Sequence, residues 1–363
     1  MRLKSIDGAR ACASLAVILC HIYLSYYQHQ IKPPRWMDTL SPLGHFGVSL
    51  FLILSGFCIS NVFVRSGAKA FDLKDFLVRR IIRIVPAYTI SITAVLAVMA
   101  LSHRQIDVWE AVTHLTLTHN LIPRFAVTMG PYWTVALEMQ LYILFALAMV
   151  ASLVIPKKIL LYLGFGAWGV WRLVMFIKYG TGYTAETFSI TFSVFGRILE
   201  FLLGVVTARY WEADRLRSLV QSHEKTLSVS GLLLVIVWLV FSSKIGPTNP
   251  LGDLLLCSGI VILFNLALHQ GTWLGKLLSL PGLVKVGEST YSTYLYHCLV
   301  IKFVGDHLLR RLPLSMAPVY LVVLSVISIV AGHGAYVLIE KKIIDMAAIK
   351  LKKTSRRPVA IVL

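Results

Sequence analysis

Charged residues are scarce in this sequence, and acidic ones especially so. Only 14% of its 363 residues are charged and 57% are hydrophobic, and 17 Asp and Glu stand against 35 Lys and Arg. Soluble domains carry about 25% charged residues, so a chain this apolar lacks the polar surface that would keep it dissolved. The low charge therefore excludes an ordinary soluble enzyme and favours a protein embedded in a membrane.

Cysteine is also sparse. All five cysteines fall inside apolar runs: Cys12, Cys20, Cys58, Cys257 and Cys298. Their spacing matches no metal-binding pattern, and none lies in a loop where a disulfide would form. His114 and His119 share no helical face and have no third ligand nearby. We therefore expect the cysteines to fill apolar space, and we expect no bound metal.

The long apolar runs predict an all-α, polytopic membrane protein with about ten transmembrane helices. Several runs approach the ~20 residues that a helix needs to cross a bilayer. The expected spans are 9–28, 44–64, 83–102, 131–155, 159–178, 190–209, 227–243, 251–270, 288–305 and 318–339. The first run ends in polar and aromatic residues rather than at a small-residue cleavage site, so we expect it to remain as the first helix.

Positive charge is distributed unevenly between the two sides of these spans. If both termini are cytoplasmic, the inner segments hold 24 Lys and Arg and the outer loops hold eight. Because cytoplasmic loops are rich in Lys and Arg, we expect both termini in the cytoplasm. The same rule explains the net charge of +18 without a nucleic acid partner. We expect one membrane domain over residues 1–345 and a basic cytoplasmic tail over 346–363.

Two polar residues of the first expected helix point in the same direction. Arg10 and His21 are eleven residues apart, which is about three turns and about 16.5 Å of rise. Alone, Arg10 is explained as a snorkelling anchor and His21 as a partner in an interhelical hydrogen bond. Their shared face adds the alternative that both line a site inside the bundle. A neutral histidine there is suited to general-base catalysis.

Three arginines lie near the start of the third expected span. Arg80 and Arg83 share a helical face at i, i+3, and Arg79 and Arg83 do so at i, i+4. Positive-inside topology explains such a cluster by itself. A phosphate-rich cytosolic ligand is the sharper alternative, because guanidinium groups bind phosphates in a forked geometry.

The fourth expected span opens with Tyr132 and Trp133, which is typical of an interfacial aromatic belt. Glu138 lies about two turns further in, where a carboxylate needs a partner. Tyr142 shares its face at i, i+4. Two roles remain open for Glu138: a structural ion pair, with Arg197 for example, and orientation of a catalytic histidine.

Other polar residues have simpler explanations. Arg197 and Glu200 are spaced i, i+3, which favours mutual neutralisation. Hydroxyl groups are frequent between Glu288 and His297, and such groups often join helices in membranes. Ser55 and Gly56 are small enough to permit close helix approach.

Taken in order, these segments resemble the acyltransferase-3 family of membrane enzymes that O-acylate polysaccharides and lipids. The similar segments are Arg10 with His21, Phe51 to Phe57, Arg79 to Tyr88, Trp133 to Tyr142 and Tyr291 to His297. The sequence departs from the family pattern at Ala9, at Thr134 and at Glu340, which no proline follows. Some relatives carry a fused hydrolase-like domain that this sequence lacks, so we expect this domain or a separate partner to complete acceptor transfer.

The resemblance implies acyl transfer, most often of acetyl, from cytosolic acyl-CoA to a hydroxyl of a glycan or lipid-linked saccharide at a bacterial cell membrane. It implies acetyl-CoA as a substrate and no tightly bound cofactor. With this reaction in view, Arg79, Arg80 and Arg83 are expected to bind the CoA phosphates. We expect His21 to act as the base, or alternatively as an acyl-carrying nucleophile, assisted by Arg10 and Glu138. The expected substrate-binding residues are Tyr132, Trp133, Tyr142 and His297.

A transporter is the competing class of function. In that case His21, Glu138 and Arg197 would form a proton relay for a glycan or small molecule. The absence of an internal repeat counts against it. A purely structural scaffold would leave the intramembrane charges unexplained.

Overall fold

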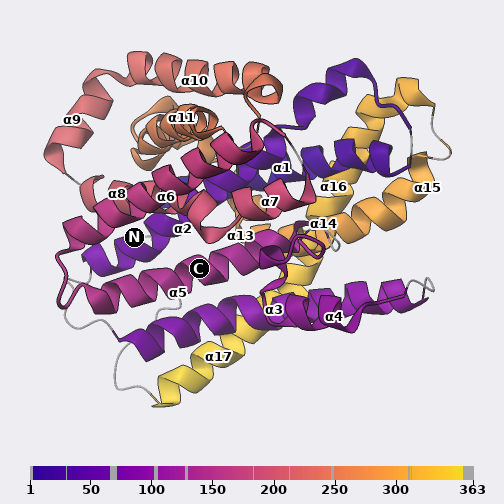
Figure 1. Ribbon diagram of the computed structural model, residues 1–363, viewed down its shortest axis with the longest axis horizontal. Helices are drawn as coiled ribbons and strands as arrows, with labels where there is room; N and C mark the ends of the chain where they lie inside the picture. Colours follow the sequence, from indigo (N-terminus) through magenta and orange to yellow (C-terminus); the bar gives the residue numbers. More distant parts are fainter. Residues whose placement is uncertain are drawn as a thin grey trace.

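Helices make up almost all of the described chain in the computed structural model (Figure 1). The structure describes residues 3–29, 31–65, 72–101, 105–126, 130–182, 184–211, 213–246, 249–309, 311 and 313–354. The helices over the expected spans are α1 (Lys4–Gln28), α2 (Leu43–Arg65), α3 (Leu73–Leu101), α5 (Trp133–Ala151), α6 (Lys157–Tyr179), α8 (Val194–Tyr210), α10 (Glu224–Ile245), α11 (Pro250–Leu268), α14 (Thr290–Val300) and α16 (Ala317–Ala335).

Shorter helices connect or extend these. They are α4 (Val108–Leu115), α7 (Ala185–Thr191), α9 (Asp214–Ser222), α12 (Trp273–Leu278), α13 (Pro281–Glu288), α15 (Asp306–Leu309) and α17 (Lys341–Thr354). The described residues also form the 3₁₀ turns η1 (Arg35–Leu40), η2 (His119–Leu121), η3 (Gly130–Tyr132) and η5 (Leu314–Met316) and the π-helical turns η4 (Ile301–Gly305) and η6 (Tyr336–Glu340). The expected boundary at residue 345 falls inside α17, and residues 355–363 of the expected tail lie outside the described residues.

Nine helices in the described part of the chain are long and apolar enough to cross a membrane. The all-α, polytopic prediction is confirmed, but the expected span at 288–305 is not among the nine. There α14 continues through η4 into α15, and the segment contains His297, Lys302 and Asp306. Ser292, Thr293 and His297 are buried in protein, whereas Lys302 further along is exposed.

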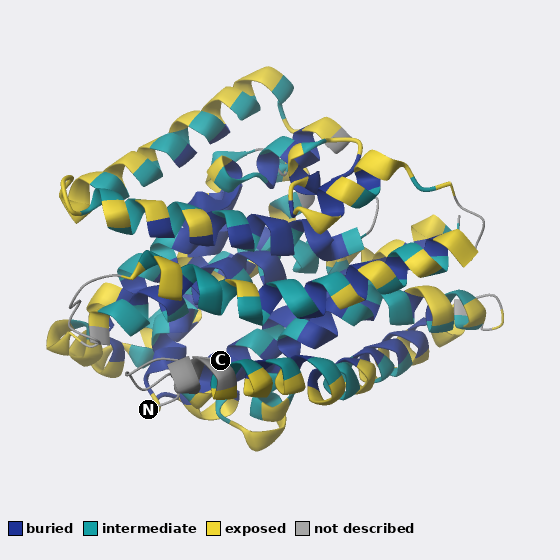
Figure 2. Cartoon of the chain, turned by 90° about the horizontal axis from the view of Figure 1, so that it is seen from below, coloured by how far each residue is buried: buried dark blue, intermediate teal, exposed yellow. Residues whose placement is uncertain are grey.

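The nine helices differ in how much of their surface the protein covers. In α1 67% of the most apolar window is buried, whereas in α6 only 11% is. Figure 2 shows buried residues gathered in the middle of the bundle and exposed ones along its outside. The exposed residues of α6 include Leu163, Val170 and Ile177, which suits a helix that faces lipid. The inner helices α1 and α2 are therefore the ones placed to carry a site.

Close helix contact fixes the centre of the bundle. A Cβ atom on Gly56 of α2 would collide with the backbone oxygen of Phe201 on α8, and one on Gly204 of α8 would collide with that of Ile53. Small residues let membrane helices approach in this way. The expectation of close approach is confirmed for Gly56, whereas Ser55 turns toward a cavity on the other side of α2.

Candidate functional site

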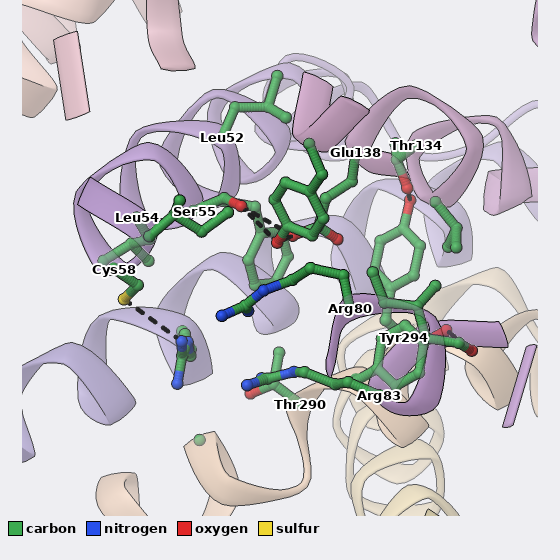
Figure 3. A pocket seen from close by; sticks show the side chains of 18 of the residues that line it. Leu52, Leu54, Ser55, Cys58, Arg80, Arg83, Thr134, Glu138, Thr290 and Tyr294 are labelled. Atoms are coloured by element: carbon green, nitrogen blue, oxygen red, sulfur yellow. Dashed lines mark hydrogen bonds between the residues drawn. The ribbon is translucent and has the colours of Figure 1, made fainter. Parts of the chain in front are cut away.

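A cavity of about 120 Å³ lies between α1, α2, α3, α5, α13, α14 and η6 (Figure 3). Its polar lining residues are Asp7, Arg10, Ser55, Cys58, Arg80, Arg83, Thr134, Glu138, Tyr142, Glu288, Thr290, Tyr291, Tyr294, Tyr336 and Glu340. Residues from almost the whole length of the chain therefore meet here, near the end of the bundle where α1 begins.

Three arginines enter this cavity from two helices. Arg80 and Arg83 come from one face of α3, as their i, i+3 spacing predicts, and Figure 3 shows their guanidinium groups extending in the same direction. Arg10 comes from α1, where it contacts Asp7 at 3.3 Å and donates to Cys58 Sγ at 3.5 Å. Arg79 is not a lining residue; its Nε lies 2.8 Å from Asp75 on the outer side of α3. Of the three arginines that the sequence analysis expects to bind phosphates, Arg80 and Arg83 line the cavity and Arg79 does not, while Arg10 is the third arginine of the lining.

Arg80 has an unusual environment for a guanidinium group. Its Cζ lies 5.6 Å from the ring centres of both Phe76 and Tyr142. Its Nε is buried without a hydrogen-bond partner, and no carboxylate of the described residues pairs with it. A cation inside a membrane protein is costly without a paired anion, and Glu138 interacts with Arg80 electrostatically without forming an ion pair. The cavity is thus suited to an anionic ligand.

Glu138 is held by two hydroxyl groups. Ser55 Oγ donates to Glu138 Oε1 at 2.9 Å, Tyr142 donates to the same oxygen, and the two hydroxyl oxygens are 2.7 Å apart. The polar contacts of Glu138 in the described chain therefore include neither Arg197 nor His21. Both roles that the sequence left open for Glu138 lack the contact on which they depend.

A second carboxylate in the lining comes from η6. Ser292 donates to Glu340 Oε2 at 2.6 Å. Single π-helical turns often occur at functional sites, and this one places Glu340 against the cavity. Little in the sequence points to Glu340, because no proline follows it as in the family pattern. The sequence feature that could have identified Glu340 is its position as a carboxylate at the end of the last apolar run.

His21 lies deeper in the bundle and does not line the cavity. It contacts His297 of α14: the distance from His297 Nε2 to His21 Nδ1 is 3.3 Å, and the ring centres are 5.0 Å apart. His21 Nδ1 also lies 2.9 Å from the Val17 carbonyl oxygen, and His297 Nδ1 lies 2.7 Å from that of Tyr294. The sequence analysis predicts both histidines as site residues, but nothing in the sequence indicates that they contact each other.

Tyr294 belongs to both the cavity and the histidine pair. Its ring lines the cavity, and its ring centre lies 5.5 Å from that of His297. Its hydroxyl accepts a hydrogen bond from Thr134 Oγ1 at 2.6 Å and donates to the Pro131 carbonyl oxygen at 2.9 Å. Tyr294 therefore forms part of the wall between the cavity and the histidines.

Two of the expected substrate-binding residues lie elsewhere. Tyr132 is buried and donates to the Leu295 carbonyl oxygen at 2.9 Å. The Trp133 ring packs against Phe188 and Phe192, with ring centres 5.3 and 4.7 Å apart. Tyr132 thus joins η3 to α14, Trp133 joins α5 to α7 and to Phe192, and neither lines the cavity.

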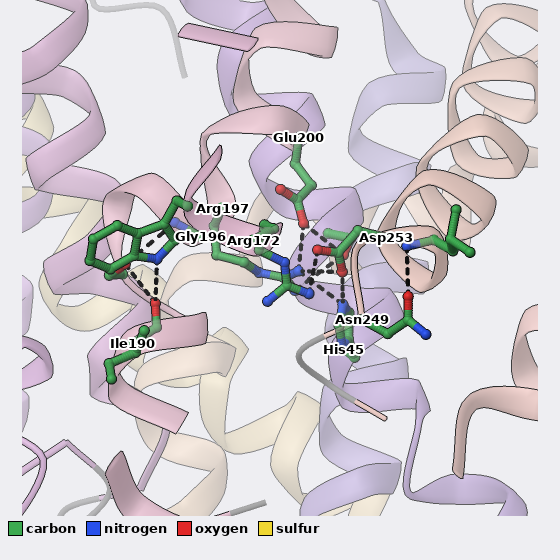
Figure 4. A network of polar contacts seen from close by, with 12 residues as sticks. His45, Arg172, Ile190, Gly196, Arg197, Glu200, Asn249 and Asp253 are labelled. Carbon is green, nitrogen blue, oxygen red and sulfur yellow. Dashed lines mark hydrogen bonds and ion pairs between the residues drawn. The ribbon is translucent and has the colours of Figure 1, made fainter. Parts of the chain in front are cut away.

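A separate charged network lies on the other side of α2 (Figure 4). Arg197 pairs with Glu200 at 2.7 Å, as its spacing predicts, and Arg172 pairs with Asp253 at 2.6 Å. Asp253 also lies 3.3 Å from Arg197 and 3.4 Å from His45. His21, Glu138 and Arg197 thus belong to three separate sets of contacts, so the relay expected for a transporter has no continuous path among the described side chains.

Among the residues that the structure describes, two groups of side chains lie close enough to share a metal ion, although the sequence spacing indicated none. They are His21, His297 and Cys298, and His45, Glu200 and Asp253, each with donor atoms within 4.8 Å. In the second group, arginines already neutralise both carboxylates. In the first, the contacts to backbone carbonyls require N–H groups on both Nδ1 atoms. Neither group needs an ion to explain its geometry.

Comparison with known proteins agrees with the motifs. The acyltransferase domain of the family Acyl_transf_3 matches residues 3–333. The chain belongs to the acyltransferase-3 family. No solved structure matches it.

Several curated relatives are similar over most of this chain. A Staphylococcus aureus (strain COL) protein named "Putative O-acetyltransferase" is 28% identical over 93% of this chain and 56% of its own length. The peptidoglycan O-acetyltransferase OatA of Listeria monocytogenes is 25% identical over 82% of this chain and 49% of its own. The O-acetyltransferase OatA of Staphylococcus aureus (strain NCTC 8325) is 24% identical over 90% and 54%. The chain thus spans about half the length of these relatives.

Proposed function

We propose that this membrane acyltransferase transfers an acetyl group from cytosolic acetyl-CoA to a hydroxyl of a cell-envelope saccharide. The observation that carries the proposal is the Arg80 guanidinium, which enters the cavity without an acidic partner among the described residues. The relatives are named as O-acetyltransferases, and one of them as a peptidoglycan O-acetyltransferase. These names support an acetyl group as the group transferred and a saccharide as its acceptor.

The donor binds with its phosphates toward the arginines. Arg10, Arg80 and Arg83 present guanidinium groups, whose paired N–H donors match phosphate oxygens. Of the four carboxylates that line the cavity, Asp7 pairs with Arg10, Glu138 is bound by hydroxyl groups and Glu340 by Ser292, and none of these three pairs with Arg80. With both termini cytoplasmic, as the Lys and Arg distribution favours, this end of the bundle faces the cytosolic pool of donor.

His21 is the general base. It takes the proton of the acceptor hydroxyl while that oxygen attacks the thioester carbonyl carbon. A carbon–oxygen bond forms, the carbon–sulfur bond breaks, and the CoA thiolate then takes the proton from His21. The acetyl end of the donor lies against Tyr294, which lines the cavity and packs against His297, the contact partner of His21.

The proposal is tested with protein purified in lipid nanodiscs, isotope-labelled acetyl-CoA and peptidoglycan fragments or other envelope glycans as acceptors. Arg80→Ala is expected to raise the KM for acetyl-CoA about tenfold or more, because a hydrogen bond to a charged group contributes roughly 1.5–3 kcal/mol. Arg79→Ala removes a neighbouring arginine outside the cavity and is expected to leave KM near the wild-type value.

Arg80→Lys separates charge from geometry. It keeps the positive charge but loses the forked donors, so its KM is expected between those of wild type and Arg80→Ala. If Arg80→Ala and Arg79→Ala gave the same KM, donor binding in this cavity would be rejected. If the wild-type protein transferred no acetyl group to any saccharide while catalysing ion-dependent flux, the transporter class would replace the enzyme.

A further inference from the structure

The backbone contacts of the two histidines identify which ring nitrogens carry protons. His297 Nδ1 lies 2.7 Å from the Tyr294 carbonyl oxygen. A carbonyl oxygen only accepts hydrogen bonds, so this nitrogen must donate and therefore carries a proton. In the neutral ring the other nitrogen, Nε2, is then unprotonated and acts as an acceptor.

The same argument applies to His21. Its Nδ1 lies 2.9 Å from the Val17 carbonyl oxygen and must also be an N–H. This nitrogen is the one that His297 Nε2 approaches at 3.3 Å. One N–H group of His21 therefore faces two acceptors, the carbonyl oxygen of Val17 and the unprotonated nitrogen of His297.

Cys298 supports this assignment. Its Sγ lies 3.4 Å from His297 Nε2, and a neutral thiol is a weak donor. Thiol and imidazole N–H thus both point at the lone pair of His297 Nε2, which keeps that nitrogen an acceptor. The only titratable neighbours that the described contacts place on His297, besides His21, are this thiol and the phenol of Tyr294.

The consequence concerns the other nitrogen of His21. With the proton on Nδ1, Nε2 carries the free lone pair, and it has no hydrogen-bond partner in the part of the chain that the structure describes. His21 is partly exposed, unlike His297. Nε2 is therefore the atom available to remove a proton from a hydroxyl.

We propose that His297 is the positioning residue for His21. It holds His21 as the tautomer with a free Nε2, and it accepts a hydrogen bond from Nδ1 of the imidazolium that forms when Nε2 is protonated. The inference rests on the proposed function of His21 as a base. It assigns to a neutral imidazole the role that a buried carboxylate has in serine hydrolases. A neutral ring suits this depth because an ionised carboxylate there is costly.

The tautomer can be measured without any activity. Protein labelled with ¹⁵N-histidine in nanodiscs gives separate Nδ1 and Nε2 resonances, and loss of one set in His21→Ala assigns that residue. We expect wild-type His21 to be protonated at Nδ1 and His297→Ala to show a mixture of tautomers. A wild-type His21 protonated at Nε2 would overturn the inference.

Kinetics test the consequence. His297→Ala is expected to lower kcat about 10–100-fold and to shift the pH dependence of kcat, with the KM for acetyl-CoA unchanged. His297→Gln places an amide oxygen near the position of Nε2 and is expected to recover part of the lost rate. His307→Ala, an exposed histidine further along the same segment, serves as the control and is expected to match wild type.

The two proposals fail separately. If the wild type transfers no acetyl group, the proposed function fails, and the tautomer is still decided by the spectra. If the wild type is active and His297→Ala keeps both its kcat and its pH profile, His297 has no positioning role. If His297→Ala does not fold, the Gln variant and the wild-type spectrum still decide the question.

Discussion

Thr134 Oγ1 on α5 donates a hydrogen bond of 2.6 Å to the hydroxyl of Tyr294 on α14. This bond, with the one from Tyr294 to the Pro131 carbonyl oxygen, holds the ring that stands between the cavity and the histidine pair. A serine usually occupies the position of Thr134 in the family pattern, and both side chains provide the hydroxyl. Either side chain can make this contact, because the contact depends on the hydroxyl rather than on side-chain volume.

Loss of this hydroxyl should disturb catalysis more than donor binding. Valine at position 134 is close to threonine in shape but cannot donate a hydrogen bond. Because a hydrogen bond of this kind contributes roughly 1 kcal/mol, we expect Thr134→Val to lower kcat several-fold. The KM for acetyl-CoA is expected to stay within about twofold of the wild-type value. Thr134→Ser keeps the donor and should match wild type in the same acetyl-transfer assay. Equal rates for Val and wild type would show that Tyr294 does not depend on this bond.

The charged network around Asp253 should be important for stability rather than for donor binding. Arg172, Arg197 and His45 all lie within 3.4 Å of Asp253, whose side chain is 2% exposed. Removing one partner of a buried ion pair leaves an uncompensated charge and costs roughly 3–5 kcal/mol. Asp253→Asn is therefore expected to lower the thermal unfolding temperature in detergent sharply.

Two controls define that result. Glu200→Gln should be milder, because the polar partners of Glu200 among the described residues are Arg197 and Ser49, and Arg197 still pairs with Asp253 in that variant. Arg217→Ala on the exposed surface of α9 should change stability by no more than about 0.5 kcal/mol. A melting temperature of Asp253→Asn equal to that of Arg217→Ala would contradict the assigned role.

Close contact between α2 and α8 gives a prediction with a matched control. Gly56→Ala places a Cβ against the backbone oxygen of Phe201, and such overpacking typically costs 1–3 kcal/mol. Gly169→Ala on α6 has no neighbouring atom within 4 Å, so it should be neutral or slightly stabilising, as Ala favours helix over Gly. Thermal unfolding of both variants, measured side by side, checks this. A stabilised Gly56→Ala protein would mean that the two helices separate at little cost.

Features of the structure that depend on short stretches of sequence could be predicted from that sequence. The spans of α2 and α6 were predictable to within two residues, because run length and hydropathy are local properties that the bilayer thickness fixes. The grouping of Arg80 with Arg83 was predictable because it follows from helical spacing. The exclusion of Arg79 was not, since spacing alone places it on a face with Arg83.

Contacts between distant helices had no sequence signal. His21 and His297 are 276 residues apart, and which residues of α1 and α14 meet depends on how every helix between them packs. The same holds for Glu138, whose partner Ser55 was selected only as a small residue. Even within a short segment, spacing misled: His114 and His119 share no helical face, yet their rings stack with centres 3.9 Å apart because the turn after α4 reverses the chain.

That stacked pair, which lies between the membrane helices α3 and α5, predicts a dependence of stability on pH. Burial, and secondarily the proximity of His114, lowers the pKa of His119 to about 3. The unfolded chain, with an ordinary histidine pKa near 6.5, binds a proton that the folded protein excludes. Stability contributed by the neutral ring is therefore complete above about pH 6.5 and is lost progressively as the pH falls toward 3.

His119→Phe keeps an aromatic ring against His114 and cannot titrate. Thermal unfolding between pH 4.5 and 8 should therefore show a weaker loss of stability on acidification for His119→Phe than for wild type, and parallel curves for the two proteins would show that His119 titrates normally in the folded state.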